Sequence, residues 1–536
     1  MQKGNGKREK DKPKADKAKN KDKQKKSLTE QFAEKLAELQ AANGVMGASG
    51  EKSRAEEEDF ALIYGFASKA TITCDARRQP FMIFDSSDGQ LVLPVRSLEL
   101  GRFFTKFFLR ETNRMPRGRS VARVLEALEA EALFVKRNEE MGLRRMAYGN
   151  ALWLDLGHPG GHAVRIDEKG WEVAQKPEAL FYRHAQQRPL PTPEKGGDPG
   201  MLEFTLGLPR EDDQLLVMAW LLACYYPGFP VPMLVLTGPQ GSGKTTLARR
   251  LKNLVDPHEA EVLALPDEEE MARILEQQAV PIFDNLGRLT PAQSNRFCRA
   301  VTGYSHLTRQ VNHGGAMAGG RSPMILTALE IPSQAADWLD RALVLRLEAK
   351  PVLRMEERRM IQIYQKHQGQ LLGLVLDFLS GTMRAYAAMP VLPNLPRMAD
   401  FATWGVAMMA VTGNEPQRFL EILHANAAQV MEEILEQDET GAAVMQFMAE
   451  KPEWEGKMET LQIELRKLNP KFKLTLIGLG RQLRKIQFNL KNAGIQLEIV
   501  KLHGMRKIRM LNHEFSKNPK VSVHPAPNEL SALELI

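Results

Sequence analysis

The spacing of hydrophobic positions predicts a mixed α/β module near the start of the chain, over residues 28–200. Short apolar runs bounded by turn residues indicate strands, and a longer helical period indicates a helix. The strands are predicted at Phe81–Phe84, Leu91–Val95, Ala151–Leu156 and Ala163–Ile166, and the helix at Arg119–Val135. A stretch rich in proline and glycine, Arg188–Gly200, marks the end of this module. It carries no recognisable catalytic constellation.

A second module, residues 201–350, alternates strands with helices. The apolar helix Asp213–Tyr226 leads to the strand Pro232–Thr237, and the alternation continues as far as Leu347. Such alternation predicts a mostly parallel sheet with helices on its faces.

Helical periodicity dominates residues 351–440, although three prolines interrupt it. The last patterned module, residues 441–512, is small and basic. Its main helix carries an apolar stripe and is predicted to end at Gly494, and two strands follow, Gln496–Leu502 and Arg506–Met510. The stripe consists of Leu479, Leu483, Ile486 and Leu490.

The composition is that of a soluble globular protein, with an apolar fraction of 43% and a charged fraction of 26%. The three cysteines, Cys74, Cys224 and Cys298, are far apart in sequence, which argues against a disulfide framework or a zinc site and for a reducing compartment. The longest apolar run, Leu215–Tyr226, is shorter than a membrane span, and the first residues are too polar for a signal peptide. A cytoplasmic protein with no membrane partner is therefore predicted.

The net charge of +7 is unevenly distributed along the chain. Residues 1–26 hold twelve Lys or Arg and four Asp or Glu, and residues 466–509 hold twelve Lys or Arg against the single Glu498, which leaves the remainder at −12. An acidic body with two basic segments is typical of a protein that contacts nucleic acid at defined places. Residues 1–27 and 513–536 are predicted to be disordered, and the first tail either solubilises the chain or contacts nucleic acid transiently.

A glycine-rich motif follows the strand Pro232–Thr237. It matches G-x-x-x-x-G-K-[ST], and a helical pattern, Thr245–Asn253, comes directly after it. Glycines let backbone N–H groups turn toward phosphate oxygens, the lysine brings a positive charge to the β and γ phosphates, and the threonine hydroxyl binds Mg²⁺. The motif therefore predicts a site for ATP and Mg²⁺. The nucleotide-binding residues are predicted to be Gly238, Pro239, Gln240, Gly241, Ser242, Gly243, Lys244, Thr245 and Thr246.

Three further polar residues are predicted to complete this site. The apolar run that starts at Ala279 ends in Asp284, which is placed to hold Mg²⁺ together with Thr245. Asn285 follows at a position where many such ATPases carry a glutamate, and an amide can orient water but cannot act as a base. Thr327 ends the next apolar run, where it either contacts the γ-phosphate or the attacking water, or only caps the strand.

An arginine, Arg341, precedes the predicted strand Leu343–Leu347. From there it can reach the nucleotide of a neighbouring subunit and stabilise the charge that develops in phosphoryl transfer. A surface ion pair is the competing interpretation. The acidic run Glu268–Glu270, in the same module, is predicted to be a solvated turn.

The order of these motifs resembles the AAA+ ATPases of the superfamily 3 helicase type. A hairpin predicted over 306–320, with its turn at His313, lies between the strands of Asp284 and Thr327, as in that family. More closely, residues 150–510 resemble ATP-binding proteins of phages, plasmids and integrated elements, which join a helicase-like core to a helical lid and a C-terminal winged helix. The segments that carry this resemblance are Gly238–Leu247, Phe283–Leu286, Ala300–Gly303, Asp340–Leu345 and Pro396–Phe401.

The resemblance implies an α/β P-loop AAA+ core over residues 201–350 and a helical lid over 351–440. It also implies a hexamer or another ring of identical subunits, with ATP and Mg²⁺ between neighbours and DNA in the central pore. By resemblance the catalytic residues are Lys244, Asp284, Thr327 and Arg341, and the pore-hairpin tip is His313. Asn285 is added to the predicted catalytic residues because it directly follows Asp284. Two positions depart from the family, because Asn285 replaces an acid and Thr327 stands where the helicases usually have asparagine.

Basic residues lie off the apolar stripe of the C-terminal helix and on the last strand. They are Arg481, Arg484 and Lys485 on the helix and Arg506 and Lys507 on the strand. A helix followed by a basic hairpin is the winged-helix plan, in which the helix enters a DNA groove and the wing contacts phosphates. Protein assembly is the alternative role of such a module.

The leading functional hypothesis is an ATP-driven DNA translocase or helicase that serves the replication of a mobile element. The second is a DNA-bound ATPase switch, such as a loader, an initiator or a defence regulator, that does not unwind DNA. A kinase of small molecules is the third, and the basic C-terminal module and Arg341 argue against it.

Overall fold

The computed structural model describes residues 49–513, except 76–77, 87–88, 135–137, 159, 309–315, 349–356, 471 and 503–504. The predicted tail 1–27, the predicted tail 513–536 apart from its first residue, and the predicted hairpin tip at His313 lie outside these residues. The chain divides into two compact units. One contains residues up to Lys69 together with Gly101–Glu126, and the other contains Ala70–Leu100 and the residues from Ala127 onward.

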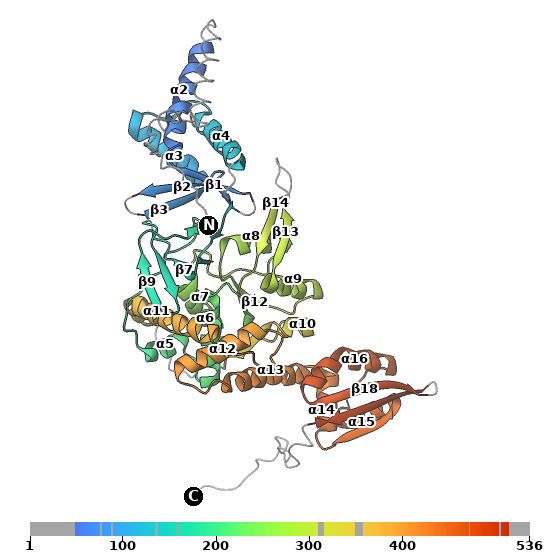
Figure 1. The fold of residues 1–536 in the computed structure, drawn as a ribbon. Coiled ribbons are helices and arrows are strands. Elements are labelled where there is room, and N and C mark those ends of the chain that lie inside the picture. Colours follow the sequence, from blue (N-terminus) through green and yellow to red (C-terminus); the bar gives the residue numbers. More distant parts are fainter. Residues whose placement is uncertain are drawn as a thin grey trace, which may run out of the picture. The chain divides into compact units, whose positions relative to one another are not determined.

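The first unit is helical and consists of α2 (Ser49–Ala67), most of α3 (Leu98–Thr112) and the first half of α4 (Ser120–Phe134) (Figure 1). A buried carboxylate, Asp59, joins its segments. Asp59 accepts hydrogen bonds from the Arg114 guanidinium at 2.9 Å and from the backbone N of Arg117 at 2.8 Å. The hydrogen bond from Arg114 lowers the pKa of Asp59 although burial opposes this shift. Helix α4 confirms the helix predicted at Arg119–Val135.

Three small sheets open the second unit. The first has the order β3-β2-β1-β4, the second pairs β5 with β10, and the third is the antiparallel meander β6-β7-β8-β9. Their strands are β1 (Thr71–Asp75), β2 (Pro80–Ser86), β3 (Gly89–Pro94), β4 (Asn138–Glu139), β5 (Met141–Gly142), β6 (Arg145–Tyr148), β7 (Ala151–Asp155), β8 (Ala163–Asp167), β9 (Gly170–Ala174) and β10 (Leu180–Phe181). The four strands predicted in this region are confirmed.

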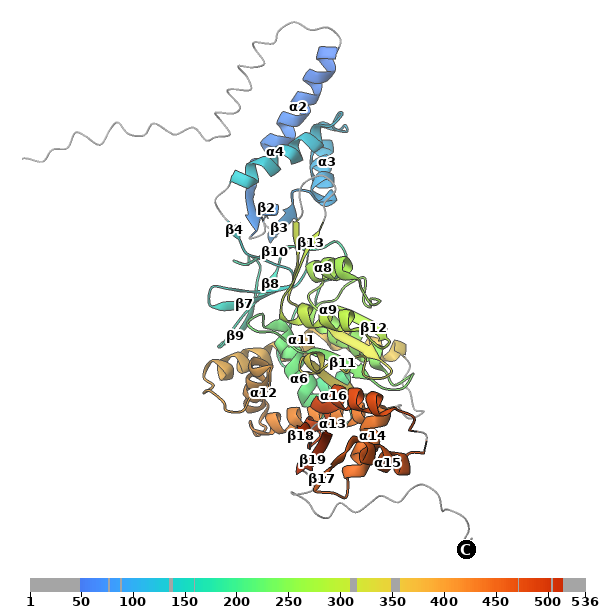
Figure 2. The ribbon, with the colours of Figure 1, turned by 90° about the vertical axis from the view of Figure 1, so that its right-hand side faces the viewer.

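The central sheet has the order β12-β15-β11-β16 and is entirely parallel, as predicted. Its strands are β11 (Met233–Thr237), β12 (Ile282–Leu286), β15 (Ile325–Ala328) and β16 (Ala342–Arg346). Alternate side chains of one strand face opposite cores. Leu234 and Leu236 join the cluster of α6 (Glu211–Tyr225) and α7 (Lys244–Val255), whereas Met233 and Val235 join the cluster of α8 (Glu268–Gln277), α9 (Pro291–Thr302) and α10 (Ala336–Leu339). Helices therefore cover both faces of the sheet (Figure 2).

The hydrophobic core does not stop at the module boundary predicted near residue 200. Leu154 of β7 and Ile166 of β8 belong to the same buried cluster as Trp220 of α6 and Leu372 of α11 (Glu357–Ala387). Short helix α5 (Pro199–Leu206) also adds Leu202 to this cluster. The meander is thus built into the body of the central sheet, and the division at residue 200 stays a prediction.

An antiparallel hairpin of β13 (Tyr304–Thr308) and β14 (Ala316–Gly320) precedes β15, which confirms the predicted insertion. It lies beside α8 (Figure 1). Three further helices follow the central sheet, namely α11, α12 (Ala399–Thr412) and α13 (Arg418–Gln437). The prolines expected to interrupt the helical pattern lie between α11 and α12.

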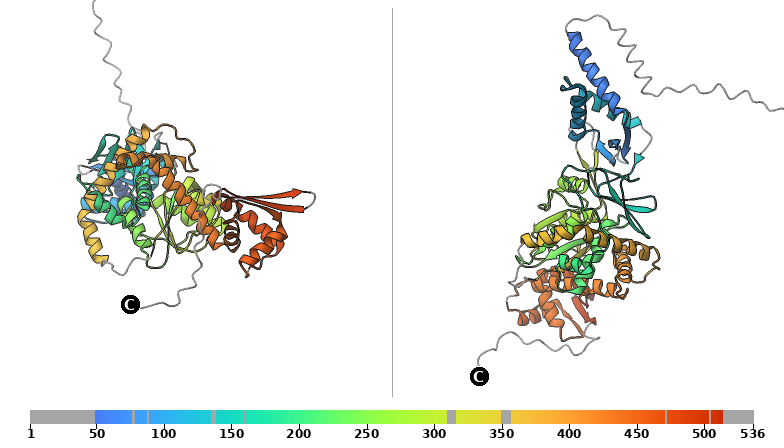
Figure 3. Two further views of the ribbon diagram at one scale, coloured as in Figure 1. Left: turned by 90° about the horizontal axis from the view of Figure 1, so that it is seen from below. Right: turned by 90° about the vertical axis from the view of Figure 1, so that its left-hand side faces the viewer.

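The C-terminal module has its own core, formed by three helices, a three-stranded sheet of order β17-β19-β18 and Leu435 from the end of α13. Figure 3 shows the long β18–β19 hairpin extending from the helices. Its elements are α14 (Glu439–Met448), β17 (Glu453–Lys457), α15 (Met458–Leu468), α16 (Leu476–Asn492), β18 (Ile495–Leu502) and β19 (Met505–Asn512). The Thr475 hydroxyl accepts from the backbone N of Gly478 at 3.1 Å and caps α16. The apolar stripe is buried as predicted, whereas β17 was not predicted.

None of the helices in the described part of the chain combines the length and the apolar composition that a bilayer crossing requires.

Candidate functional site

The loop Gly238–Gly243 joins the buried strand β11 to helix α7. Its three glycines all have positive φ, of 135° at Gly238, 79° at Gly241 and 91° at Gly243, a region that side chains disfavour. A Cβ atom at Gly238 would also lie 2.1 Å from the carbonyl oxygen of Leu347. Within the described residues, the backbone amides of Gly241 and Gly243 donate no hydrogen bond. The loop is therefore a tight turn with amide groups available to an anion.

The side chain of Lys244, the first residue of α7, folds back over this loop. Its Nζ donates to the carbonyl oxygens of Gly238 at 2.7 Å and Pro239 at 2.8 Å. Burial lowers the pKa of the Lys244 ammonium, and the nearby carboxylate of Asp284 opposes this shift. The positive charge is thus held at the mouth of the loop, where phosphate oxygens would meet it.

One carboxylate oxygen connects three elements beside the loop. Asp284 Oδ1, on β12, accepts from Thr245 Oγ1 of α7 at 2.9 Å and from Thr327 Oγ1 of β15 at 2.5 Å. Thr327 is 1% exposed, and its Oγ1 also accepts from the backbone N of Asn285 at 2.9 Å. The structure therefore brings together four of the predicted site residues, Thr245, Asp284, Asn285 and Thr327, at the end of the parallel strands.

The backbone at Asn285 is unusual. Its φ is 56°, and the pairing of β12 with β15 shifts its register between Phe283 and Leu286. Asparagine tolerates this left-handed conformation better than most residues, and glutamate tolerates it less well. The asparagine that replaces the expected acid thus suits the local backbone, and its side chain is exposed.

The donors at this site fit magnesium. A carboxylate and a hydroxyl, 2.9 Å apart at Asp284 and Thr245, are hard oxygen ligands of the kind that Mg²⁺ uses beside substrate phosphates. The glycine loop and Lys244 lie directly next to them. The residues present are therefore a suitable set for Mg-ATP.

Arg341 lies at the end of the central sheet where the strands begin, opposite the end that carries the loop Gly238–Gly243. The backbone N of Met233 donates to the Arg341 carbonyl at 2.8 Å, and β11 pairs with β16 in parallel from Met233–Ala342 to Thr237–Arg346. A strand advances about 3.3 Å per residue, so the start of β11 is about 13 Å from the loop that follows its end. The Arg341 backbone is thus a whole strand length away from the loop of its own chain.

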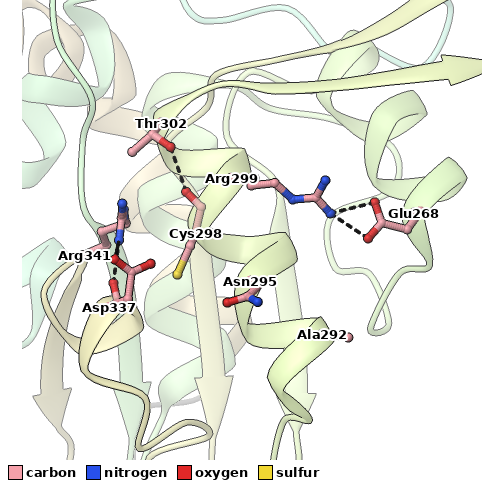
Figure 4. A pocket seen from close by; sticks show the side chains of 8 residues that line it. All are labelled: Glu268, Ala292, Asn295, Cys298, Arg299, Thr302, Asp337 and Arg341. Atoms are coloured by element: carbon pink, nitrogen blue, oxygen red, sulfur yellow. Dashed lines mark hydrogen bonds and ion pairs between the residues drawn. The ribbon is translucent and has the colours of Figure 1, made fainter.

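The Arg341 side chain lines a cavity of about 490 Å³ between α8, α9 and α10 (Figure 4). It forms an ion pair with the Asp337 carboxylate and donates from Nη1 to the Asp337 carbonyl at 2.7 Å. Arg397 also pairs with Asp337, at 2.6 Å. The hydrogen bond from Arg341 lowers the pKa of Asp337. The ion pair of the competing interpretation is thus present, although the Arg341 side chain is only 12% exposed and the pair is not a plain surface one.

The acidic run Glu268–Glu270 is not the solvated turn that was predicted. It forms the first turn of α8, where Asp267 and Glu270 make a reciprocal capping box. Glu268 pairs with Arg299 at 2.7 Å, as Figure 4 shows, and accepts from the Tyr304 hydroxyl. These contacts engage the Glu268 carboxylate with residues of α9 and β13.

Sequence reasoning missed Arg346, the last residue of β16. It pairs with Thr237 in the sheet and so lies at the end of the strands where the loop Gly238–Gly243 begins. Its Nη1 contacts Glu433 of α13 at 3.0 Å, with the side chain 56% exposed. No local pattern distinguishes this arginine, because its position depends on the strand order.

The C-terminal basic residues fall into two groups. Arg481, Arg484 and Lys485 are exposed on α16, whereas Lys507 pairs with Glu455 at 3.0 Å. The glutamate comes from β17, so part of the hairpin's charge is neutralised within the module. Arg506 belongs to β19.

Residues 206–425 match a family model described as the actinomycete integrative conjugative element replication protein. Two solved structures are similar over most of the chain. The apo C-terminal region of NrS-1 has 14% identity and a TM-score of 0.40, with 84% of this chain and 98% of that chain covered. SCCmec type IV Cch, an active helicase, has 10% identity and a TM-score of 0.41, with 84% and 94% covered. TM-scores this low do not establish a common fold. No curated protein matches the chain.

The matched family model covers the central sheet and the helices that follow it. This supports the predicted likeness to proteins of integrated elements and, within it, to replication proteins. The superfamily 3 type, the winged helix and the individual site residues stay predictions.

Proposed function

We propose that this protein is a Mg-ATP-dependent motor that translocates on or unwinds DNA during replication of a mobile element. The observation that carries the proposal is that the hydroxyls of Thr245 and Thr327 both donate to one carboxylate oxygen of Asp284, beside a glycine loop and Lys244. Each group comes from a different element at the same edge of a parallel sheet. The family match over residues 206–425 supports the link to replication.

In this proposal the loop amides and Lys244 bind the β and γ phosphates. Thr245 and Asp284 hold Mg²⁺, which supplies positive charge to the phosphate oxygens. Thr327 fixes the Asp284 carboxylate, since its hydroxyl donates to it at 2.5 Å. Asn285 orients the attacking water from an exposed position at the end of β12 but cannot take its proton.

Arg341 acts on the nucleotide of a neighbouring subunit. Its backbone lies where the strands of the central sheet begin, at the opposite end from the loop of its own chain. A contribution to hydrolysis therefore requires the nucleotide of a second copy. The Arg341 side chain faces a cavity of about 490 Å³ that can receive part of that copy. Closure of such contacts around a ring agrees with the cyclic symmetry of most homo-oligomers.

DNA contacts are proposed for the exposed face of α16, with Arg481, Arg484 and Lys485, and for the hairpin β13–β14, whose tip the sequence predicts at His313. A DNA-bound switch that hydrolyses ATP without unwinding is the second candidate. The observation that favours it is Asn285, because a site without the usual acid is expected to turn over slowly.

Hydrolysis of ATP by the purified full chain tests the proposal first. Lys244→Ala should abolish turnover, because it removes the charge on the phosphates, and hydrolysis near the wild-type rate would remove the assignment of the site. A strand-displacement assay on the wild type then separates the candidates. Displacement that requires ATP supports the motor, and ATP hydrolysis with no displacement and no movement on DNA supports the switch.

A further inference from the structure

A second cavity, of about 230 Å³, lies at the edge of the central sheet where the strands begin. Val231 precedes β11 and Pro323 precedes β15, and both residues line it. The nucleotide loop follows the other end of β11. The two sites are therefore separated by the length of a strand, about 13 Å.

Two arginines face this cavity, and its remaining lining residues are uncharged. Arg145 begins β6, and within the described residues its guanidinium makes one hydrogen bond, from Nη1 to the Ala279 carbonyl at 3.5 Å. Arg321, an exposed residue, donates to the carbonyl of Pro227. No carboxylate within the described residues forms an ion pair with either guanidinium, whereas the adjacent Arg144 pairs with the buried Asp256.

Without an ion pair, the charge of Arg145 is only partly compensated. Burial lowers the pKa of the Arg145 guanidinium, the nearby Cys224 and Asp256 oppose this shift, and the positive charge of Arg321 adds to it. Two like charges in a partly enclosed pocket are stabilised by an anion that both can contact. A guanidinium presents parallel N–H groups that match the oxygens of a phosphate.

The aromatic wall of the cavity is already in place. Tyr226 stacks on Trp404 with ring centroids 5.0 Å apart, and Phe229 packs against the same indole at 5.6 Å. Tyr386 contacts all three rings. A pocket with such fixed walls requires little rearrangement to accept a ligand.

We propose that Arg145 and Arg321 form a phosphate-binding site separate from the nucleotide loop. The phosphate can come from the backbone of DNA or from a free nucleotide. The DNA backbone is the source we favour, because Arg321 directly follows β14 and so lies at the base of the β13–β14 hairpin. This choice of source rests on the proposed function, whereas the phosphate site itself does not.

The experiment compares the full-length wild type with Arg321→Gln and Arg145→Lys. Arg273→Gln is the matched control, because Arg273 is exposed on α8 and pairs with Glu269 outside the cavity. Binding of single-stranded and duplex oligonucleotides is measured across a salt series. Loss of one phosphate contact should lower the log–log salt slope by about 0.7 on single strands and about 0.9 on duplex. Arg145→Lys should keep the slope but weaken binding, since lysine retains the charge without the planar fork.

A second arm measures stabilisation by inorganic phosphate and by ATP in the same variants. If free phosphate is the ligand, Arg321→Gln loses stabilisation by inorganic phosphate while its DNA slope stays unchanged. ATP hydrolysis without DNA should be unchanged in either case, because the nucleotide loop lies at the opposite end of the strands of the central sheet. If Arg321→Gln behaves like Arg273→Gln in both the DNA-binding and the phosphate measurements, the proposed phosphate site is wrong. A wild type that binds no DNA contradicts the proposed function instead, and the phosphate arm still decides the site.

Discussion

Replacing Thr327 with valine removes one hydroxyl and keeps the shape of the side chain. That hydroxyl donates to Asp284 Oδ1 at 2.5 Å and accepts from the backbone N of Asn285 at 2.9 Å, and the residue is 1% exposed. A hydrogen bond to a charged group contributes about 1.5–3 kcal/mol, and a buried donor without a partner costs about 1–3 kcal/mol. Because water can reach the exposed Asn285, the lower ends apply, and we expect a loss of about 2.5 kcal/mol.

In a domain of about 150–250 residues such a loss lowers Tm by about 5–10 °C. The second unit, which contains Thr327, is larger, so we expect a smaller fall, which thermal unfolding of the variant measures. ATP turnover at several Mg²⁺ concentrations should fall about 10–100-fold, since partners that orient a metal ligand have effects of this size. Thr327→Ser keeps the hydroxyl and is the control, with turnover close to wild type. If Thr327→Val unfolds at the wild-type temperature and turns over ATP at the wild-type rate, Thr327 does not position Asp284 and only caps its strand.

Asn285→Gly keeps the positive φ and should leave stability nearly unchanged. A steep fall in ATP turnover with unchanged nucleotide affinity would assign the Asn285 amide to positioning the attacking water, whereas unchanged turnover would show that it has no such role. Burial lowers the pKa of His258 from 6.5 to about 4. The unfolded chain therefore binds this proton first as pH falls from 6.5 to 4, and the folded state loses up to about 3 kcal/mol over that window. His258→Gln should flatten the pH dependence of Tm there, whereas an unchanged curve would assign the acid sensitivity to other groups. Replacing Arg484 and Lys485 on α16 should lower the salt slope of DNA binding by roughly one to two units, and an unchanged slope would make the C-terminal module an assembly domain.

Local patterns predicted the nucleotide loop well. The glycines, Lys244 and Thr245 all lie within one short segment, residues 238–245, and the strand before it and the helix after it each have a clear hydrophobic period. Asp284 and Thr327 could be anticipated because both end apolar runs in a module of parallel strands. The shared contact at Asp284 Oδ1 could not, since it depends on the order β12-β15-β11.

Features that depend on strand order or register could not be predicted from the sequence. Arg346 and Thr237 are far apart along the chain and meet only because β16 lies beside β11. Strand β17, Glu453–Lys457, has two glutamates and a glycine and no apolar alternation, and it is recognisable only through its pairing with β19. The cavity of Arg145 and Arg321 likewise joins segments that no short motif connects.

The central claim is that ATP is hydrolysed between two copies of the chain, with Lys244 from one and Arg341 from the other. Arg341→Ala should bind ATP but lose most hydrolysis, because an arginine in this role contributes about 10³–10⁵ in rate. Turnover is therefore measured in mixtures of Lys244→Ala and Arg341→Ala, each inactive alone. Mixed interfaces that pair an intact Lys244 with an intact Arg341 should recover part of the wild-type activity. Mixtures that stay inactive at every ratio, from a protein that remains monomeric with ATP, would contradict the account.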